Sequence, residues 1–183
     1  MIRTVYIYGS PVLRKVAQNI NPDYPELEAL IPDMFETMKQ SDGIGLAAPQ
    51  IGLSIRLFVI DGTPLADDDP SLKNFRKVFI NAQMVERFGE KVIYNEGCLS
   101  IPGIHEDVER ESKVRIRYYD ENFVEHEEVY DGMAARIILH EYDHTEGILF
   151  TDRVSPIQKQ LLRSKLNAMA KGKYSTSYKS RIG

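Results

Sequence analysis

Apolar residues recur at helical spacing in three separate segments of the chain. The first segment, residues 25–40, places five apolar side chains on one face: Leu27, Leu30, Ile31, Met34 and Met38. Pro25 suits the first turn of a helix, and the SDG sequence at 41–43 interrupts the pattern. The spacing therefore predicts an amphipathic helix over residues 25–40.

The second segment, residues 132–145, is apolar nearly all round. Asp131 precedes it as a candidate N-cap, and Gly147 follows shortly after its end. Apolar side chains on every face are typical of a helix that is enclosed by the rest of the protein. The pattern predicts a buried helix over 132–145.

The third segment, residues 156–172, has Ser155 as a candidate cap, Pro156 in its first turn and Gly172 at its end. Its apolar stripe consists of Ile157, Leu161, Leu162, Leu166 and Met169. We expect a C-terminal helix here.

Between the first two helices the pattern changes to one that is typical of strands. β-branched and aromatic residues predominate in six short segments at 55–60, 77–81, 84–88, 91–95, 113–120 and 123–130. The short spacing between them favours hairpins and antiparallel pairing over a series of parallel strands joined by helices. GIGLAAPQIG at 43–52 predicts a loop, and residues 61–74 predict an acidic surface loop.

Length and composition exclude several classes of protein. A chain of 183 residues usually makes one domain with a substantial core. We find neither a signal peptide nor an apolar stretch of the ~20 residues that a membrane helix needs. The single cysteine excludes an internal disulfide framework and fits a reducing compartment. We therefore expect a soluble cytoplasmic protein.

Charge is distributed unevenly along the chain. The net charge is −4, yet after Asp152 there are eight basic residues and no acidic one. This segment has two interpretations: a solvated helix face with a frayed polar tail, or an electrostatic docking element. We expect a single catalytic domain over residues 1–172 and a polar basic tail over 173–183.

The predicted buried helix carries the sequence HEYDH, which would be costly to bury without polar partners. His140 and His144 are four residues apart, so both imidazoles leave one face of a helix and can reach one divalent metal. Glu141 lies between them, where it can act as a general base toward a water molecule. The alternative is a helix with two surface histidines, against which the surrounding apolar residues argue.

A catalytic metal site of this type needs a third protein ligand. In one protease class that ligand is a histidine that follows in the motif, but Phe150 stands at its position here. No glutamate occurs after Glu146, so the third ligand must lie upstream. Cys98, in NEGCLSIPG, is the leading candidate because thiolates bind zinc and ferrous iron strongly.

Three motifs in this order, GIGLAAPQ (43–50), EGCLS (96–100) and HEYDH (140–144), closely resemble the signature of the peptide deformylase family. The resemblance implies an α+β fold, with antiparallel or mixed β-sheets packed around the HExxH helix. It also implies a hydrolase that removes the formyl group from the N-terminal formyl-methionine of nascent chains and releases formate. Leu139 and Thr145 depart from residues that are common in the family at those positions.

The same resemblance assigns roles to individual residues. Cys98, His140 and His144 match the metal ligands, and Glu141 matches the acid/base. Gln50 and the backbone N–H of Leu99 match the contacts to the oxyanion. The family typically uses ferrous iron, with zinc, nickel or cobalt as substitutes.

Other residues are expected to bind substrate or to support the ligands. Gly43, Ile44, Gly45 and Gly97 would let a peptide backbone dock against the enzyme backbone. Met133 and Ile137 precede His140 by one or two helical turns and are candidate walls for the methionine side chain, unless they are ordinary core residues. Glu96 and Arg110 are expected to pair, either to brace the cysteine motif or as a surface ion pair.

Two other functions use the same parts: a zinc endopeptidase, or a non-catalytic module with a closed metal site. We further hypothesise that the basic C-terminal segment docks on the ribosome, as it does in some members of the family. We expect no membrane partner and no sequence-specific binding of nucleic acid.

Overall fold

A computed structural model describes all residues from Met1 to Gly183. It contains three α-helices: α1 (Leu27–Gln40), α2 (Gly132–Thr145) and α3 (Pro156–Ala170). Five strands form an antiparallel sheet in the order β2 (Gly45–Ala47), β3 (Leu57–Asp61), β4 (Arg76–Cys98), β5 (Ile101–Tyr119) and β6 (Glu125–Asp131). A separate parallel pair joins β1 (Val5–Tyr6) to β7 (Ser180–Arg181). The α+β class and the antiparallel pairing are confirmed.

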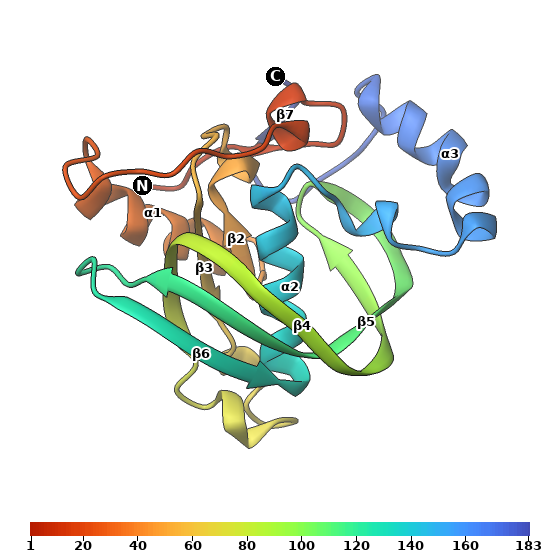
Figure 1. Cartoon of the computed structure of the whole chain (residues 1–183). Helices are drawn as coiled ribbons and strands as arrows, with labels where there is room; N and C mark the ends of the chain where they lie inside the picture. The colour runs from red at the N-terminus through yellow and green to blue at the C-terminus, as the bar shows by residue number, and fades with distance from the viewer.

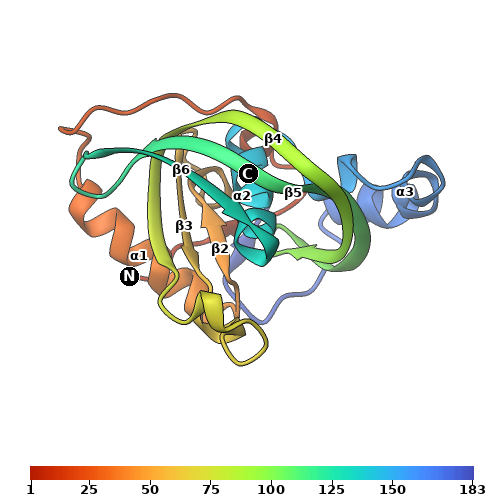
Figure 2. The same ribbon diagram turned by 60° about the horizontal axis from the view of Figure 1, so that its bottom comes forward.

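The sheet lies between α1 and α2. Alternate residues of its strands point to opposite faces, so one face packs against each helix. Leu57 and Val59 of β3 belong to the core that α1 covers, whereas Phe58 and Ile60 belong to the core around α2. Figure 1 shows α2 at the centre with strands on both sides of it. Figure 2 shows the long strands β4 and β5 arching over α2.

The strand predictions were correct in type but wrong in extent. The segments at 77–81, 84–88 and 91–95 are parts of one strand, β4, which pairs along its length with β5. Four register shifts interrupt this pairing, and each shift breaks the alternation of inward and outward side chains. Residues 101–112, predicted as no particular element, form the first part of β5, where charged residues obscure the pattern.

The prediction of a loop over 43–52 was wrong in part. Residues Gly45–Ala47 form the edge strand β2, and Ala48–Ile51 form a single 3-10 turn. Small residues and a proline favour a loop locally, but hydrogen bonding to β3 determines the structure of this segment.

The helices begin and end close to the predicted residues. Ser155 caps α3 by accepting from the N–H of Gln158, but the Asp131 side chain makes no capping hydrogen bond at α2. Of the predicted stripe on α3, Leu162, Leu166 and Met169 are buried, whereas Ile157 and Leu161 are 71% and 67% exposed. None of the helices combines the length and the hydropathy that crossing a membrane requires.

Candidate metal centre and active site

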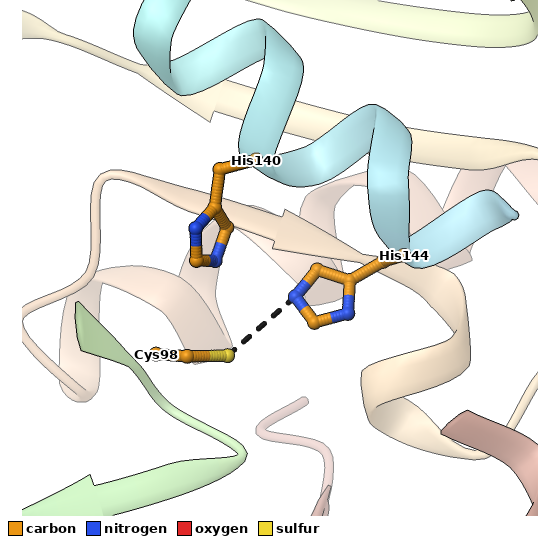
Figure 3. Close-up of side chains that lie close together, drawn as sticks. All are labelled: Cys98, His140 and His144. Atoms are coloured by element: carbon orange, nitrogen blue, oxygen red, sulfur yellow. Dashed lines mark hydrogen bonds between the residues drawn. The ribbon is translucent and has the colours of Figure 1, made fainter. Parts of the chain in front are cut away.

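The structure brings together the three predicted metal ligands. His140 and His144 leave the same face of α2, and Cys98 lies at the end of β4 opposite them, as Figure 3 shows. One donor atom from each residue lies within 4.8 Å of the other two. Cys98 Sγ is 3.5 Å from His144 Nε2. A thiolate and two imidazoles at this spacing can hold one divalent metal ion.

Glu141 lies beside these donors and is 4% exposed. Burial raises the pKa of its carboxyl group to about 7. Its Oε1 atom is buried and has no hydrogen-bond partner within the chain. A buried carboxylate with a free oxygen next to three ligand atoms suits a site that also holds a metal and a water molecule. The residues therefore fit the metal that the sequence predicts.

The buried carboxylate of Glu96 orients His140. Its Oε1 accepts a hydrogen bond of 2.9 Å from His140 Nδ1, and Arg110 donates to both of its oxygens, at 2.7 and 3.0 Å. Burial alone would raise the pKa of Glu96, but the hydrogen bonds from His140 and Arg110 outweigh it and hold the pKa well below the ordinary value. Glu96 and Arg110 thus form a buried pair behind the site rather than a surface ion pair.

Burial also determines the charge of the second histidine. It lowers the pKa of His144 well below the ordinary value, and the neighbouring His140 lowers it further. A neutral imidazole is the form that binds a metal. His144 is therefore ready to act as a ligand at neutral pH.

Gln50 and Leu99, the predicted oxyanion contacts, both lie next to Cys98. Gln50 Oε1 accepts from the N–H of Ala47 at 3.0 Å, which leaves the amide nitrogen to donate toward Ser100 Oγ at 3.2 Å and Cys98 Sγ at 3.4 Å. The backbone N–H of Leu99 makes no hydrogen bond within the chain. The Leu99 N–H is therefore an unpaired donor near the predicted ligands, and the Gln50 amide nitrogen already points at Cys98 Sγ.

A cleft of about 560 Å³ opens over these groups. The predicted substrate-binding residues all line it: Gly43, Ile44, Gly45, Gly97, Met133 and Ile137. His105, for which the sequence indicates no role, also lines the cleft, and a Cβ atom at Gly97 would lie 2.6 Å from its ring. Only glycine at 97 leaves room for this histidine in its present position.

Sequence reasoning missed the role of Arg136 and the partners of Asp143. Arg136 donates to Glu96 Oε2 at 2.6 Å and to the carbonyls of Val108 and Val92. Its position one turn before His140 was the available signal, because residues four apart share a helix face. Asp143 binds Arg110 and Arg153, and no local pattern indicates this contact.

Residues Ser175–Tyr178 also line the cleft, although they lie more than 30 residues beyond HEYDH in the chain. The sequence predicts this region as part of a polar tail. Nothing in its composition indicates that the chain returns to the site.

Three donor atoms for one metal, a buried carboxylate and an unpaired backbone N–H beside a cleft define a metal-dependent hydrolase. The comparisons with known proteins specify which one. Residues 2–160 match the family model described as polypeptide deformylase.

Relatives extend over the whole chain. The peptide deformylase of Christiangramia forsetii is 51% identical, over 100% of this chain and 96% of that protein. The peptide deformylase of Flavobacterium johnsoniae is 50% identical, also over 100% of this chain and 96% of that protein. The crystal structure of peptide deformylase from Thermus thermophilus is 36% identical and superposes with a TM-score of 0.83, covering 94% of this chain and 99% of that chain.

The chain belongs to the peptide deformylase family. It is a hydrolase that removes the N-formyl group from nascent polypeptides. This finding decides against the two alternative functions, the zinc endopeptidase and the non-catalytic metal-binding module.

Proposed function

We propose that Cys98, His140 and His144 hold one ferrous ion, with zinc, nickel or cobalt as functional substitutes. One soft thiolate and two imidazoles suit each of these metals. When bound, the metal supplies Lewis acidity that polarises the formyl C=O and makes water more acidic. The observation that carries the proposal is the convergence of these three donors beside the buried Glu141.

Glu141 moves the protons of the reaction. Its carboxylate accepts a proton from the water that attacks the formyl carbon, and it then delivers a proton to the nitrogen of the leaving amine. The pKa of about 7 that burial imposes suits a group that must both accept and release a proton near neutral pH.

Gln50 and Leu99 stabilise the negative charge that develops on the formyl oxygen. The Gln50 amide nitrogen faces Cys98 Sγ, and its carbonyl oxygen is fixed by Ala47. The Leu99 N–H is unpaired within the chain and follows the cysteine directly. Each such donor is worth roughly 3 kcal/mol in other oxyanion holes.

The cleft positions the substrate. Gly43, Ile44 and Gly45 lie at the start of the edge strand β2, where the backbone of an extended peptide can add alongside. Met133 and Ile137 lie on the side of α2 that faces the cleft and provide apolar walls for the methionine side chain. Glu96 and Arg110 act indirectly, by fixing the orientation of His140.

The test of metal and substrate together uses anaerobically purified protein. Its metal content is measured first, and activity is then measured after reconstitution with each of the four metals in turn. Formyl-Met peptides are compared with peptides that offer only internal amide bonds. We expect formate release with ferrous iron and no internal cleavage; zinc as the only activating metal would refute the iron assignment.

For the basic C-terminal segment we propose docking on the ribosome. Lys159 and Arg163 lie on α3, which also exposes Ile157 and Leu161, and α3 stands at the edge of the molecule in Figure 1. Reversing the charge of Lys159 and Arg163 should weaken ribosome binding and reduce its salt dependence. Reversing Lys91 and Lys113 on the β4–β5 hairpin is the matched control. Equal binding by both variants would contradict the docking role.

In this proposal the catalytic domain comprises residues 1–172, and the segment 173–183 packs against it through the pairing of β7 with β1 and lines part of the cleft. We place the enzyme in the cytoplasm, because its substrates are nascent chains.

A further inference from the structure

The segment after α3 returns to the body of the protein and is held there by sheet hydrogen bonds. The N–H of Val5 donates to the carbonyl of Lys179, and that of Ile7 donates to the carbonyl of Arg181, both at 2.9 Å. The N–H of Gly183 donates to Ser10 Oγ at 3.1 Å. Pairing of β7 with β1 therefore determines where Ser175–Tyr178 lie, and they lie in the wall of the cleft.

Tyr178 makes the most direct contact with the catalytic groups. Its hydroxyl donates to the backbone carbonyl of Leu99 at 2.5 Å, and its side chain packs against the same apolar cluster as Cys98 and Leu99. The next carbonyl, that of Ser100, accepts from the N–H of Tyr8 at 2.8 Å. Both carbonyls that follow Cys98 are thus held by the unit formed by the N- and C-terminal segments.

We propose that Tyr178 positions the Cys98–Leu99 turn for catalysis, and that Ser175 and Ser177 form the part of the cleft that contacts substrate residues beyond the methionine. This inference rests on the roles proposed above for Cys98 and Leu99. It makes the C-terminal segment a part of the active site rather than a tail.

The positioning role follows from backbone geometry. Leu99 lies outside regular structure, between the ends of β4 and β5, so no strand pairing fixes its peptide groups. A hydrogen bond to its carbonyl restricts rotation of the Leu99 backbone and, with it, the direction of the unpaired N–H. Small displacements of catalytic groups have large effects on rate. The hydroxyl of Tyr178 is bonded to the Leu99 carbonyl and to no metal-ligand residue, so we assign its effect to the position of Leu99.

The role in specificity follows from exposure. Cys98, His140 and Glu141 line the cleft and are partly or fully buried, whereas Ser175 and Ser177 are exposed. Neither serine side chain makes a hydrogen bond within the chain, and Thr176 between them is held by Tyr178 and Ser180. When the formyl group of a substrate lies at the base of the cleft, the substrate residues after the methionine therefore lie next to the hydroxyls of Ser175 and Ser177.

Tyr178→Phe tests the positioning role, because it keeps the ring and removes only the hydroxyl. We expect kcat on a formyl-Met tetrapeptide to fall about 3- to 10-fold, with little change in KM and full metal content. Tyr174→Phe is the matched control, since Tyr174 packs in the same cluster but does not line the cleft. A wild-type kcat for Tyr178→Phe, or an equal fall in the control, would overturn the positioning role.

Ser177→Tyr tests the specificity role, because it adds bulk at an exposed position and should not affect folding. We expect KM for formyl-Met-Ala-Ala-Ala to rise at least about 5-fold, while KM for formyl-Met amide stays unchanged. If both substrates are affected equally, or neither is, Ser177 does not contact the later residues.

A failure of the roles proposed for Tyr178 and Ser177 can be distinguished from a failure of the proposed metal site. Cys98→Ala is assayed for metal content alongside the other variants. If Cys98→Ala retains its metal, the ligand assignment fails whatever the tyrosine variants do. If it loses its metal and Tyr178→Phe has the kcat of the wild type, only the positioning role fails.

Discussion

Gly45 and Glu141 are in such close contact that a Cβ atom at position 45 would lie 2.5 Å from Glu141 Oε2. Real Cβ contacts are essentially never this short, so the Glu141 side chain can lie in this position against β2 only with glycine at 45. The carboxylate that we propose as the acid/base therefore lies directly against a strand that also lines the cleft.

Gly45→Ala should consequently displace Glu141 and lower kcat/KM by about 10- to 100-fold, because catalytic geometry tolerates little displacement. Steady-state kinetics on a formyl-Met peptide measure the effect, and circular dichroism checks the fold. Gly62→Ala, whose nearest side-chain atom would be 3.2 Å away in Leu72, is the control outside the cleft. Wild-type kinetics for Gly45→Ala would show that this contact does not hold the carboxylate.

Glu96→Gln should weaken both the fold and the metal site. The buried Arg110 and Arg136 lose their charged partner, and breaking a buried pair in this way costs about 3–5 kcal/mol. The change also alters the hydrogen bond that orients His140, from which we expect a 10- to 100-fold loss of metal affinity. Denaturant unfolding and metal titration measure the two effects.

Glu127→Gln is the matched surface control for this variant. Glu127 pairs with Arg117 at 2.8 Å, but both side chains are largely exposed, so the change should cost ~0–1 kcal/mol. Equal losses of stability in the two variants would mean that Glu96 contributes no more than a surface ion pair.

Acid should weaken a second polar cluster, at the end of the sheet. Tyr118 and Tyr130 donate to Glu128, and although burial alone would raise the pKa of Glu128, these hydrogen bonds lower it. Because the pKa of Glu128 is lower in the folded state, its interactions stabilise the protein at pH values above the unfolded-state pKa of about 4.5. This stabilisation is lost as the pH falls through the pKa of the folded state. Tyr118→Phe should therefore reduce the free energy of unfolding more at pH 7 than at pH 3.

Urea denaturation of the wild type and Tyr118→Phe at the two pH values measures this difference. If Tyr118→Phe lowers the free energy of unfolding by the same amount at pH 7 and pH 3, the Tyr118 hydroxyl interacts as strongly with protonated Glu128 as with the carboxylate. That result would contradict the prediction.

Removal of the metal should abolish activity and lower the melting temperature, because a ligand that binds only the folded state stabilises it by mass action. Restoring ferrous iron to the chelated protein should reverse both effects. In Cys98→Ala the melting temperature should respond to neither chelator nor iron. A wild-type melting temperature that is insensitive to the metal would contradict tight binding at the three donors.

The parts of the site that the sequence predicts are those that depend on local spacing. His140 and His144 share a helix face because they are four residues apart, as any i, i+4 pair does. Cys98 was predicted as the third ligand because no other suitable residue occurs downstream. The extents of the strands were less predictable, because the register shifts in β4 cancel the alternation on which strand prediction relies.

Contacts between distant segments could not be predicted in the same way. Tyr178 reaches Leu99 only because β7 pairs with β1, and two-residue strands leave no pattern in a sequence. Arg136 was within reach of sequence reasoning, since it lies one turn before His140. Its partners Val92 and Val108, however, are brought to it by the folding of the β4–β5 hairpin.

The most direct test of the central claim is a paired measurement of metal content and turnover in Glu141→Gln. We expect one metal ion per chain, as in the wild type, and loss of nearly all formate release, because the ligands are intact and the proton carrier is gone. A Glu141→Gln protein that retains its metal and deformylates at the wild-type rate would contradict the role of Glu141 as the proton carrier.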